Sequence, residues 1–352
     1  APSLNADNTL AGKSTLSDAA MAAEYFRHPA PQGSKGQPAP DNRVYGPGPR
    51  VPLYVISPWS RGGWVNSEVF DHTSVLRFLE ARFGVQEPNI SPYRRAVCGD
   101  LLSAFNFKTP NTETLPTLKG RSTRDAADQL RTAQQALPAV PVPTDMQLPV
   151  QASGVRPSRA LAYELHTSAR ANANGSIQLL FSNTGQRAAV FHVYDALHLD
   201  RIPRRYIVEA GKMLDDTWTT QATDAGRYDL WVLGPNGFHR HFKGDTTRLA
   251  ASKATPEIRV CYDIANGHVY AEMMNGGTAP VQFSIVSMAY RKDGPWTASV
   301  AGGATSTQHW SLADSGRWYD FAVTCDADPA FYRRFAGRVE TGEHSVSDPA
   351  MG

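Results

Sequence analysis

Cysteine is scarce in this sequence, with three residues among 352, and no two of them form a CxxC pair. This spacing excludes the common zinc and dithiol redox motifs. The sequence also has no large excess of one charge, since its formal net charge is +2. It therefore lacks the strongly basic character expected of a protein that binds nucleic acid or an anionic membrane surface. No apolar run reaches the ~18 residues that a spanning helix needs. We therefore expect no nucleic-acid partner and no transmembrane segment.

Complete catalytic signatures are absent as well, since the sequence contains no GxSxG elbow, HExxH, Walker loop or GxGxxG. The best constellation of polar residues is Glu68, Asp71 and His72. Two carboxylates and an imidazole can bind a metal or orient a phosphate, because hydrolysis needs groups that hold charge near a developing oxyanion. The alternative is that Asp71 caps a helix and that His72 is a structural histidine.

Residues 1–108 have the pattern of the end of an α/β domain. The compact apolar run at 51–56, bounded by prolines, fits a buried strand of a parallel sheet. A polar loop follows, and then a helix is predicted that stops at Gly84. Ligands of such folds bind beyond the carboxyl ends of strands, where this loop would lie. The apolar stripe of the predicted helix consists of Val75, Leu76, Leu79 and Phe83.

Two segments are rich in proline and polar residues. Residues 1–42 look irregular, apart from one short helix at 17–26 with Ser17 as its cap. Residues 109–150 form a linker rich in proline and threonine, in which 122–137 can make one exposed helix.

Beyond residue 150 the sequence repeats itself. Gly175 and Asn183 recur as Gly267 and Asn275, each 92 residues later. A dozen matches keep the same order, with small insertions between them, so a duplication is the natural explanation. The other matches include Phe191 with Phe283, Tyr228 with Tyr319, and Phe238, Arg240 and Phe242 with Phe331, Arg333 and Phe335.

Each copy has the period of two that is typical of a strand with one buried face. Turn signals such as Asn174-Gly175 and Asn266-Gly267 separate these runs. Several short strands in about 90 residues suggest a small antiparallel sandwich. We therefore expect an α/β remnant followed by two tandem all-β sandwich domains, at 151–250 and 251–345. The alternating runs include Ile177, Leu179 and Phe181, and Val269, Ala271 and Met273.

Four histidines gather in the first copy. His239 and His241 lie two residues apart, so they would share one face of a strand and could form a metal pair. The alternative is an ordinary surface role, which is favoured because the second copy has Tyr332 and Arg334 in these places. The other two histidines are His192 and His198.

The second copy holds two cysteines and three tryptophans of interest. Cys261 and Cys325 each lie at the edge of a predicted strand, and they are either a disulfide or two buried thiols. Three tryptophans either line a groove for a lipid or a quaternary amine, or belong to the core. These are Trp296, Trp310 and Trp318.

Residues 46–84, GPGPRVPLYVISPWSRGGWVNSEVFDHTSVLRFLEARFG, resemble the closing segment of the catalytic domain of bacterial phospholipase C. The run SPYRRAVCGDLLSAFNF at 91–107 continues the resemblance, and the opening APSLNADNTLAGKST is similar to the stretch after the family's acidic metal-binding motif. The two β copies resemble the paired C-terminal domains of these enzymes. The family is phosphocholine-preferring and belongs to the alkaline phosphatase-like superfamily.

The resemblance implies hydrolysis of phosphatidylcholine and sphingomyelin at a membrane surface by a secreted or periplasmic enzyme. It also implies a divalent metal in the complete enzyme, although no residue here is identified as a ligand. The family's metal motif and its threonine or serine nucleophile are not in this sequence, so an N-terminal catalytic half is the expected partner. Carried over by residue, the resemblance offers His72, and less directly Asp71 and Glu68, as active-site neighbours.

Two other functions remain open at this point. The tandem β domains can be a non-catalytic module that binds lipid headgroups, a cell surface or a protein, with the α/β remnant as scaffold. They can also be a structural tail that stabilises an exported enzyme.

Overall fold

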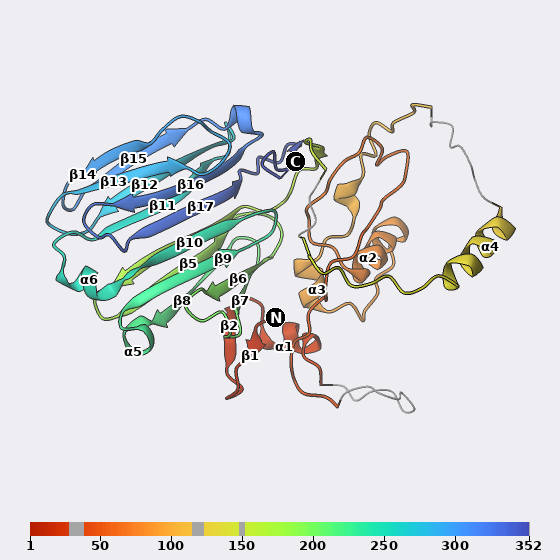
Figure 1. Ribbon diagram of the computed structural model, residues 1–352, viewed down its shortest axis with the longest axis horizontal. Helices are drawn as coiled ribbons and strands as arrows, with labels where there is room; N and C mark the ends of the chain where they lie inside the picture. The colour runs from red at the N-terminus through yellow and green to blue at the C-terminus, as the bar shows by residue number, and fades with distance from the viewer. Residues whose placement is uncertain (28–38, 115–122, 148–151, 352) are drawn as a thin grey trace.

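The computed structural model describes residues 1–27, 39–114, 123–147 and 152–351. Most of the regular secondary structure in these ranges is β-sheet, and the helices are few and short (Figure 1). No helix in these ranges has both the length and the apolar character needed to cross a bilayer. The α-helices are α1 (Asp18–Met21), α2 (His72–Phe83), α3 (Pro92–Val97), α4 (Arg124–Gln135), α5 (Thr220–Asp224) and α6 (Thr246–Ala251), and the 3-10 helices are η1 (Ala22–Glu24), η2 (Leu102–Ala104) and η3 (Ala313–Ser315).

The early part of the chain contains the predicted helix but lacks the predicted strand. Helix α2 ends at Gly84, which has a φ of 70°, as expected of a stop glycine. Residues 51–56 form no strand, and Ile56 is 94% exposed, so the expected buried parallel strand is wrong. The reason is that a strand needs a neighbour for its backbone hydrogen bonds, and no strand within the described ranges lies beside this run.

The opening residues are more regular than expected. Strands β1 (Ser3–Leu4) and β2 (Leu10–Ser14) form a short antiparallel pair before α1, whose Ser17 cap accepts a hydrogen bond from the Ala20 amide. Strand β2 also pairs in parallel with a strand of the first repeat, and this contact passes so close to Gly12 that a Cβ there would lie 1.9 Å from the Arg205 carbonyl oxygen. The predicted linker helix is present as α4 and its residues are exposed.

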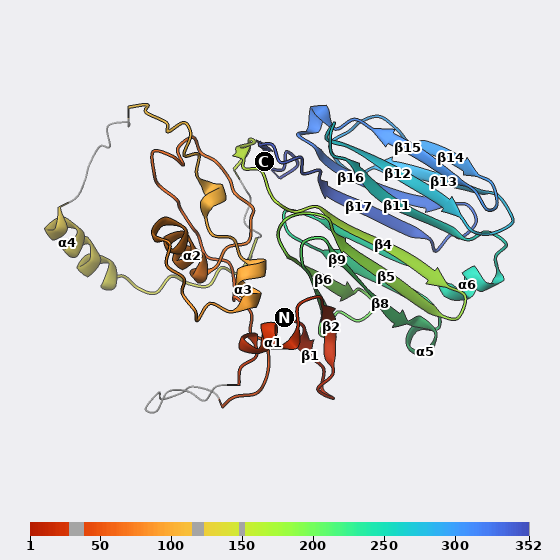
Figure 2. The ribbon, with the colours of Figure 1, turned by 180° about the vertical axis from the view of Figure 1, so that it is seen from behind.

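The rest of the chain forms two matching sets of strands. In each set, three strands form a small sheet and four join a long ten-stranded sheet, and the strand order is the same in both (Figures 1 and 2). The first set is β4 (Leu165–Asn172), β5 (Ser176–Asn183), β6 (Ala189–Asp195), β7 (Arg204–Val208), β8 (Lys212–Thr219), β9 (Arg227–Leu233) and β10 (His239–Asp245). The second is β11 (Pro256–Asp263), β12 (His268–Asn275), β13 (Val281–Ser287), β14 (Trp296–Val300), β15 (Thr305–Trp310), β16 (Trp318–Cys325) and β17 (Tyr332–Arg338). The short strands β3 (Pro157–Ser158) and β18 (Ser345–Val346) pair with each other.

The repeat extends to the hydrogen bonds of one buried asparagine in each copy. The side-chain amide of Asn183 donates to the carbonyl oxygens of Arg187, at 2.7 Å, and Val208, at 3.0 Å. Asn275 donates in the same way to Ala279, at 2.8 Å, and Val300, at 3.1 Å. Each asparagine therefore ties its own strand to two other segments of the same copy inside the protein.

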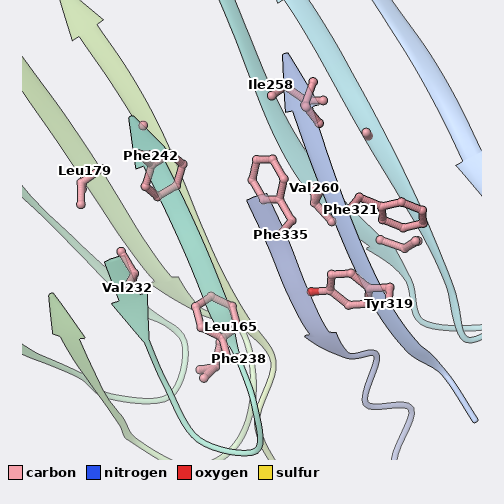
Figure 3. Packing of buried hydrophobic residues seen from close by; sticks show 14 of the residues in the cluster. Leu165, Leu179, Val232, Phe238, Phe242, Ile258, Val260, Tyr319, Phe321 and Phe335 are labelled. Carbon is pink, nitrogen blue, oxygen red and sulfur yellow. The ribbon is translucent and has the colours of Figure 1, made fainter. Parts of the chain in front are cut away.

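The two copies share one core. In the first, Phe181 of the small sheet stacks on Tyr206 of the long sheet, with ring centroids 4.3 Å apart. In the second, Trp310 of the small sheet lies 4.7 Å from Phe321 of the long sheet, with the two rings tilted by 30°. One cluster of buried side chains runs through both copies. Figure 3 shows part of this cluster, with Leu179 and Phe242 of the first copy and Phe335 and Phe321 of the second. The two tandem β copies that were expected therefore lie side by side and share one long sheet.

The join is the antiparallel pairing of β10 with β17, the last strands of the two copies. Its register places Arg240 opposite Phe335 and Phe242 opposite Arg333. Because these residues are equivalent in the repeat, the pairing has an approximate two-fold symmetry. We call this strand pair the seam.

Both seam arginines are buried and bind the opposite copy. Arg240, 1% exposed, donates to the hydroxyls of Tyr319 and Tyr262 and to the Ala336 carbonyl, each at 2.8 Å. Arg333, 0% exposed, donates to the Tyr228 hydroxyl at 3.0 Å and to the Lys243 carbonyl at 2.8 Å. The two sites differ in charge, because Arg333 also forms a bidentate ion pair with Glu257, at 2.8 and 2.9 Å. Arg240 has no carboxylate among its direct hydrogen-bond partners in the described chain.

The disulfide alternative is wrong, because all three cysteines are free thiols. Cys261 lies on β11 of a small sheet and Cys325 on β16 of the long sheet. Val260, the neighbour of Cys261, faces the core, so the Cys261 side chain points to the opposite face and away from Cys325.

Replacing Asn183 or Asn275 with alanine should lower the free energy of unfolding by about 3 kcal/mol, because buried carbonyl groups lose their donor. Chemical denaturation measures this. Asn266→Ala, in an exposed turn, is the control and should change it by less than about 0.5 kcal/mol. Equal effects at the buried and exposed positions would contradict the role given to the asparagines.

Replacing Arg333 with methionine should cost about 3–5 kcal/mol, because the Glu257 carboxylate is left without its cation. Arg240→Met should lower the free energy of unfolding by only about 1–3 kcal/mol, since it leaves hydroxyl and carbonyl groups without a donor but leaves no charge without a partner. Denaturation curves of both variants test this order. Adding Glu257→Gln to Arg333→Met should recover part of the loss, and an equal cost for the two arginines would refute the asymmetry.

Candidate functional site

Asp71 caps helix α2, as one of the two sequence alternatives predicts. Its side chain accepts hydrogen bonds from the amide of Thr73, at 2.9 Å, and from the Thr73 hydroxyl, at 2.6 Å. The Ser74 hydroxyl accepts in return from the Asp71 amide at 3.0 Å. This reciprocal pair is a capping box, which fixes where the helix starts.

The second oxygen of Asp71 belongs to an ion-pair network. Arg94, on α3, donates to Asp71 Oδ2 at 2.8 Å and lies 2.8 Å from Glu24 Oε2. The side chains of Asp71 and Glu24 are 5% and 4% exposed, whereas that of Arg94 is 22% exposed. One guanidinium therefore ties together η1, α2 and α3.

The network changes the protonation of the groups around it. Burial alone would raise the pKa of Asp71, but hydrogen bonds from Thr73 and Arg94, together with the Arg94 charge, outweigh it and lower that pKa below its ordinary value. Burial first, and then the nearby Asp71 charge, raise the pKa of the Cys98 thiol to about 12. Cys98 therefore stays protonated at neutral pH and is a poor nucleophile.

Glu68 lies apart from this network and contacts the first β repeat. Its Oε1 is 3.2 Å from Arg187 Nε, and the same guanidinium lies 3.2 Å from Asp100. The Ser103 hydroxyl donates to the other oxygen of Glu68. The contact with Arg187 is an ion pair without hydrogen-bond geometry, so Oε1 is a buried oxygen with no hydrogen-bond donor in the described chain.

The structure therefore does not gather the three candidate residues around one point. Asp71 and Glu68 are held by different arginines, and His72 is exposed on the first turn of α2 with no hydrogen-bond partner in the described ranges. The carboxylates can orient the segment that carries His72. Arg94 and Arg187, their partners, were not expected, because ion pairs between distant segments leave no local pattern in a sequence.

A second group of candidate ligands lies in the first β repeat. Asp195, His198 and Asp224 place one ligand atom each within 4.8 Å of one another, which is the one such group in the part of the chain that the structure describes. His198 contacts Asp224 directly, and Arg201 lies 2.9 Å from Asp195. Sequence reasoning singled out His198 but missed both aspartates, since only the Asp195-x-x-His198 spacing hints at one of them.

The other histidines and the tryptophans have structural surroundings. His239 and His241 share one face of β10, as expected, with ring centroids 6.4 Å apart. Trp310 and Trp318 are both 4% exposed, and Trp296 packs 5.4 Å from Trp310. Trp310 therefore belongs to the core cluster, Trp296 is partly buried against it, and Trp318 is buried, which favours the core alternative over a groove.

Asp71→Asn should destabilise the protein at pH 7 by about 1 kcal/mol, because the charge facing Arg94 is lost. The folded-state pKa of Asp71 is lowered, so its stabilisation is complete above the ordinary aspartate pKa of ~3.9 and disappears as the pH falls through the lower folded value. Unfolding curves at pH 7 and pH 3 should show the gap between wild type and variant closing. Asp125→Asn, on exposed α4, is the control, and a gap independent of pH would contradict the ion pair.

Comparison with known families matches both parts of the chain. The family model described as "Bacterial phospholipase C, C-terminal domain" matches twice, over residues 157–245 and 256–338, which contain the two sets of strands. The model described as "Phosphoesterase family" matches residues 21–86, which contain Glu68, Asp71 and His72.

Curated relatives agree with these models. A non-hemolytic phospholipase C of Pseudomonas aeruginosa is 48% identical over 100% of this chain and 49% of its own length. A non-hemolytic phospholipase C of Burkholderia pseudomallei is 45% identical over 87% of the chain and 44% of its length. A hemolytic phospholipase C of Pseudomonas aeruginosa is 40% identical over 87% and 45%. The chain spans about half the length of these relatives, and it belongs to the bacterial phospholipase C family.

Proposed function

We propose that this chain is the C-terminal part of a secreted or periplasmic phospholipase C. The complete enzyme would hydrolyse phosphatidylcholine and sphingomyelin to phosphocholine and diacylglycerol or ceramide. The observation that carries the proposal is the order of the matches along one chain, with a phosphoesterase segment followed by two phospholipase C C-terminal domains. In this proposal, residues 1–108 are the end of an alkaline phosphatase-like catalytic domain.

An exposed apolar surface supports a partner for the phosphoesterase segment. The stripe of α2 that was expected to be buried is exposed, and Ile56 and Tyr54 are 94% and 82% exposed. Apolar patches of this kind normally mark a surface that another part of a protein covers. We infer that the catalytic half of such an enzyme packs on it. The exposed residues of the stripe are Val75, Leu76, Leu79 and Phe83.

The residues of this chain do not fit a catalytic metal site. Both Glu68 and Asp71 have an arginine beside their carboxylates, which competes with a cation, and His72 lies apart from them. The group of Asp195, His198 and Asp224 lies outside the phosphoesterase segment. We therefore assign no catalytic step through a metal to these residues.

The role that the geometry supports for Asp71 and Glu68 is positioning. Asp71 fixes the start of α2, and its first residue, His72, has an imidazole free to donate a hydrogen bond to a substrate phosphate. Glu68 ties the same loop to the first β repeat through Arg187. The β repeats would then hold the loop in place from outside the catalytic domain.

The proposal predicts that a hybrid enzyme is active. In it, this chain replaces the matching half of the non-hemolytic phospholipase C of Pseudomonas aeruginosa, and phosphocholine release from phosphatidylcholine vesicles is measured. We expect turnover by the hybrid and none by this chain alone, because the chain offers positioning groups without a nucleophile. His72→Ala in the hybrid should lower turnover about 10–100-fold.

His309→Ala, an exposed histidine of the second β repeat, is the matched control and should leave turnover unchanged. A folded but inactive hybrid would overturn the proposed function. Turnover by this chain alone would show instead that the chain is catalytically complete.

A further inference from the structure

A groove of about 680 Å³ crosses the outer face of the long sheet at the seam. Arg240 and Phe242 of β10 point inward to the core, so the alternate residues His239, His241 and Lys243 face the groove. Strands β9 and β17 flank β10 in the sheet (Figure 1). Side chains of both strands also line the groove. A loop at 329–331 lines one side. Both repeats therefore contribute residues to the groove.

Three aromatic rings follow one another along this groove. The indole of Trp231, on β9, lies 6.1 Å from the His241 imidazole, and the Tyr332 ring, on β17, lies 5.1 Å from it on the next strand. The interplanar angles are 86° and 66°, so the imidazole stands edge-on between two larger rings. The rings lie along the surface and do not enclose a single point.

Both Arg334 and Lys243, which line the groove, have a carboxylate partner. Arg334 binds Asp320 through two hydrogen bonds, at 2.8 and 2.6 Å. Asp229 lies 2.6 Å from His241 and 3.5 Å from Lys243. These pairs leave the groove close to neutral overall while supplying donors and acceptors in fixed positions.

The fold does not require the side chains of Trp231 and Lys243, because the second copy has smaller residues at the equivalent positions. The residue equivalent to Trp231 in the second copy is Ala322, and the residue equivalent to Lys243 is Ala336. Inward positions of the same strands are kept, as with Phe242 and Phe335. Trp231 and Lys243 are therefore free to serve a ligand.

We propose that the groove binds a neutral oligosaccharide. Sugar rings present apolar C–H faces to aromatic rings and hydroxyl groups to paired charges, which is the combination found here. A phosphate would have to compete with Asp320 and Asp229 for the cations. A quaternary amine needs aromatic faces around one point within about 6 Å, and the rings lie in a row. The site goes beyond the proposed lipase function and does not depend on it.

The test is isothermal titration calorimetry of the full chain with cellohexaose, chitohexaose, maltohexaose and laminarihexaose. Phosphocholine and inorganic phosphate are the competing probes. We expect at least one neutral hexasaccharide to bind, and Trp231→Ala and Tyr332→Ala each to weaken that binding at least tenfold. Trp59→Ala, an exposed tryptophan of the phosphoesterase segment, should leave it unchanged.

Lys243→Ala, at an exposed position, is the variant that keeps the test valid if an aromatic replacement unfolds the protein, and it should weaken binding several-fold. Absence of binding by all four sugars would overturn the proposal. So would binding of phosphocholine or phosphate alone, or sugar binding that Trp231→Ala and Lys243→Ala both leave intact.

Discussion

The two buried arginines of the seam are the constraint on which the β half of the molecule depends. Arg240 and Arg333 each lie inside the core, and each finds a tyrosine hydroxyl and a backbone carbonyl on the opposite copy. A buried charge is tolerated only where such partners are in place. Separating the copies would strip both guanidinium groups of these partners. The duplication therefore produces one continuous sheet, and neither copy has a satisfied core without the other.

The long sheet presents different surfaces on its two sides. Its inner face is the shared core, and its outer face carries the aromatic and charged groove at the seam. Residues 1–108 are attached at the other end, through β2 on β7 and through Glu68 beside Arg187. The paired domains thus hold the loop before α2 in place from one side. The apolar stripe of α2 stays open for the part of a phospholipase C that would carry the chemistry.

Sequence reasoning predicted the features that depend on neighbours in the chain. The cap at Asp71, the stop at Gly84 and the alternating strands all follow from local patterns, and the repeat itself is visible at a fixed spacing. The strand at 51–56 failed because apolar content cannot supply a pairing partner. The seam was not foreseen, although an arginine at an inward position in both copies was a signal for it. Of the candidate site, the helix cap was predictable, whereas Arg94 and Arg187 come from distant segments.

Native-state hydrogen exchange of the full chain tests most directly whether the seam unites the copies. The account predicts that the amides of β10 and β17 exchange only through global unfolding, at the same rate as the central strands β5 and β12. Much faster exchange at the seam, with both cores still protected, would mean that the copies separate as independent units. That result would contradict the claim that the arginines bind them into one sheet.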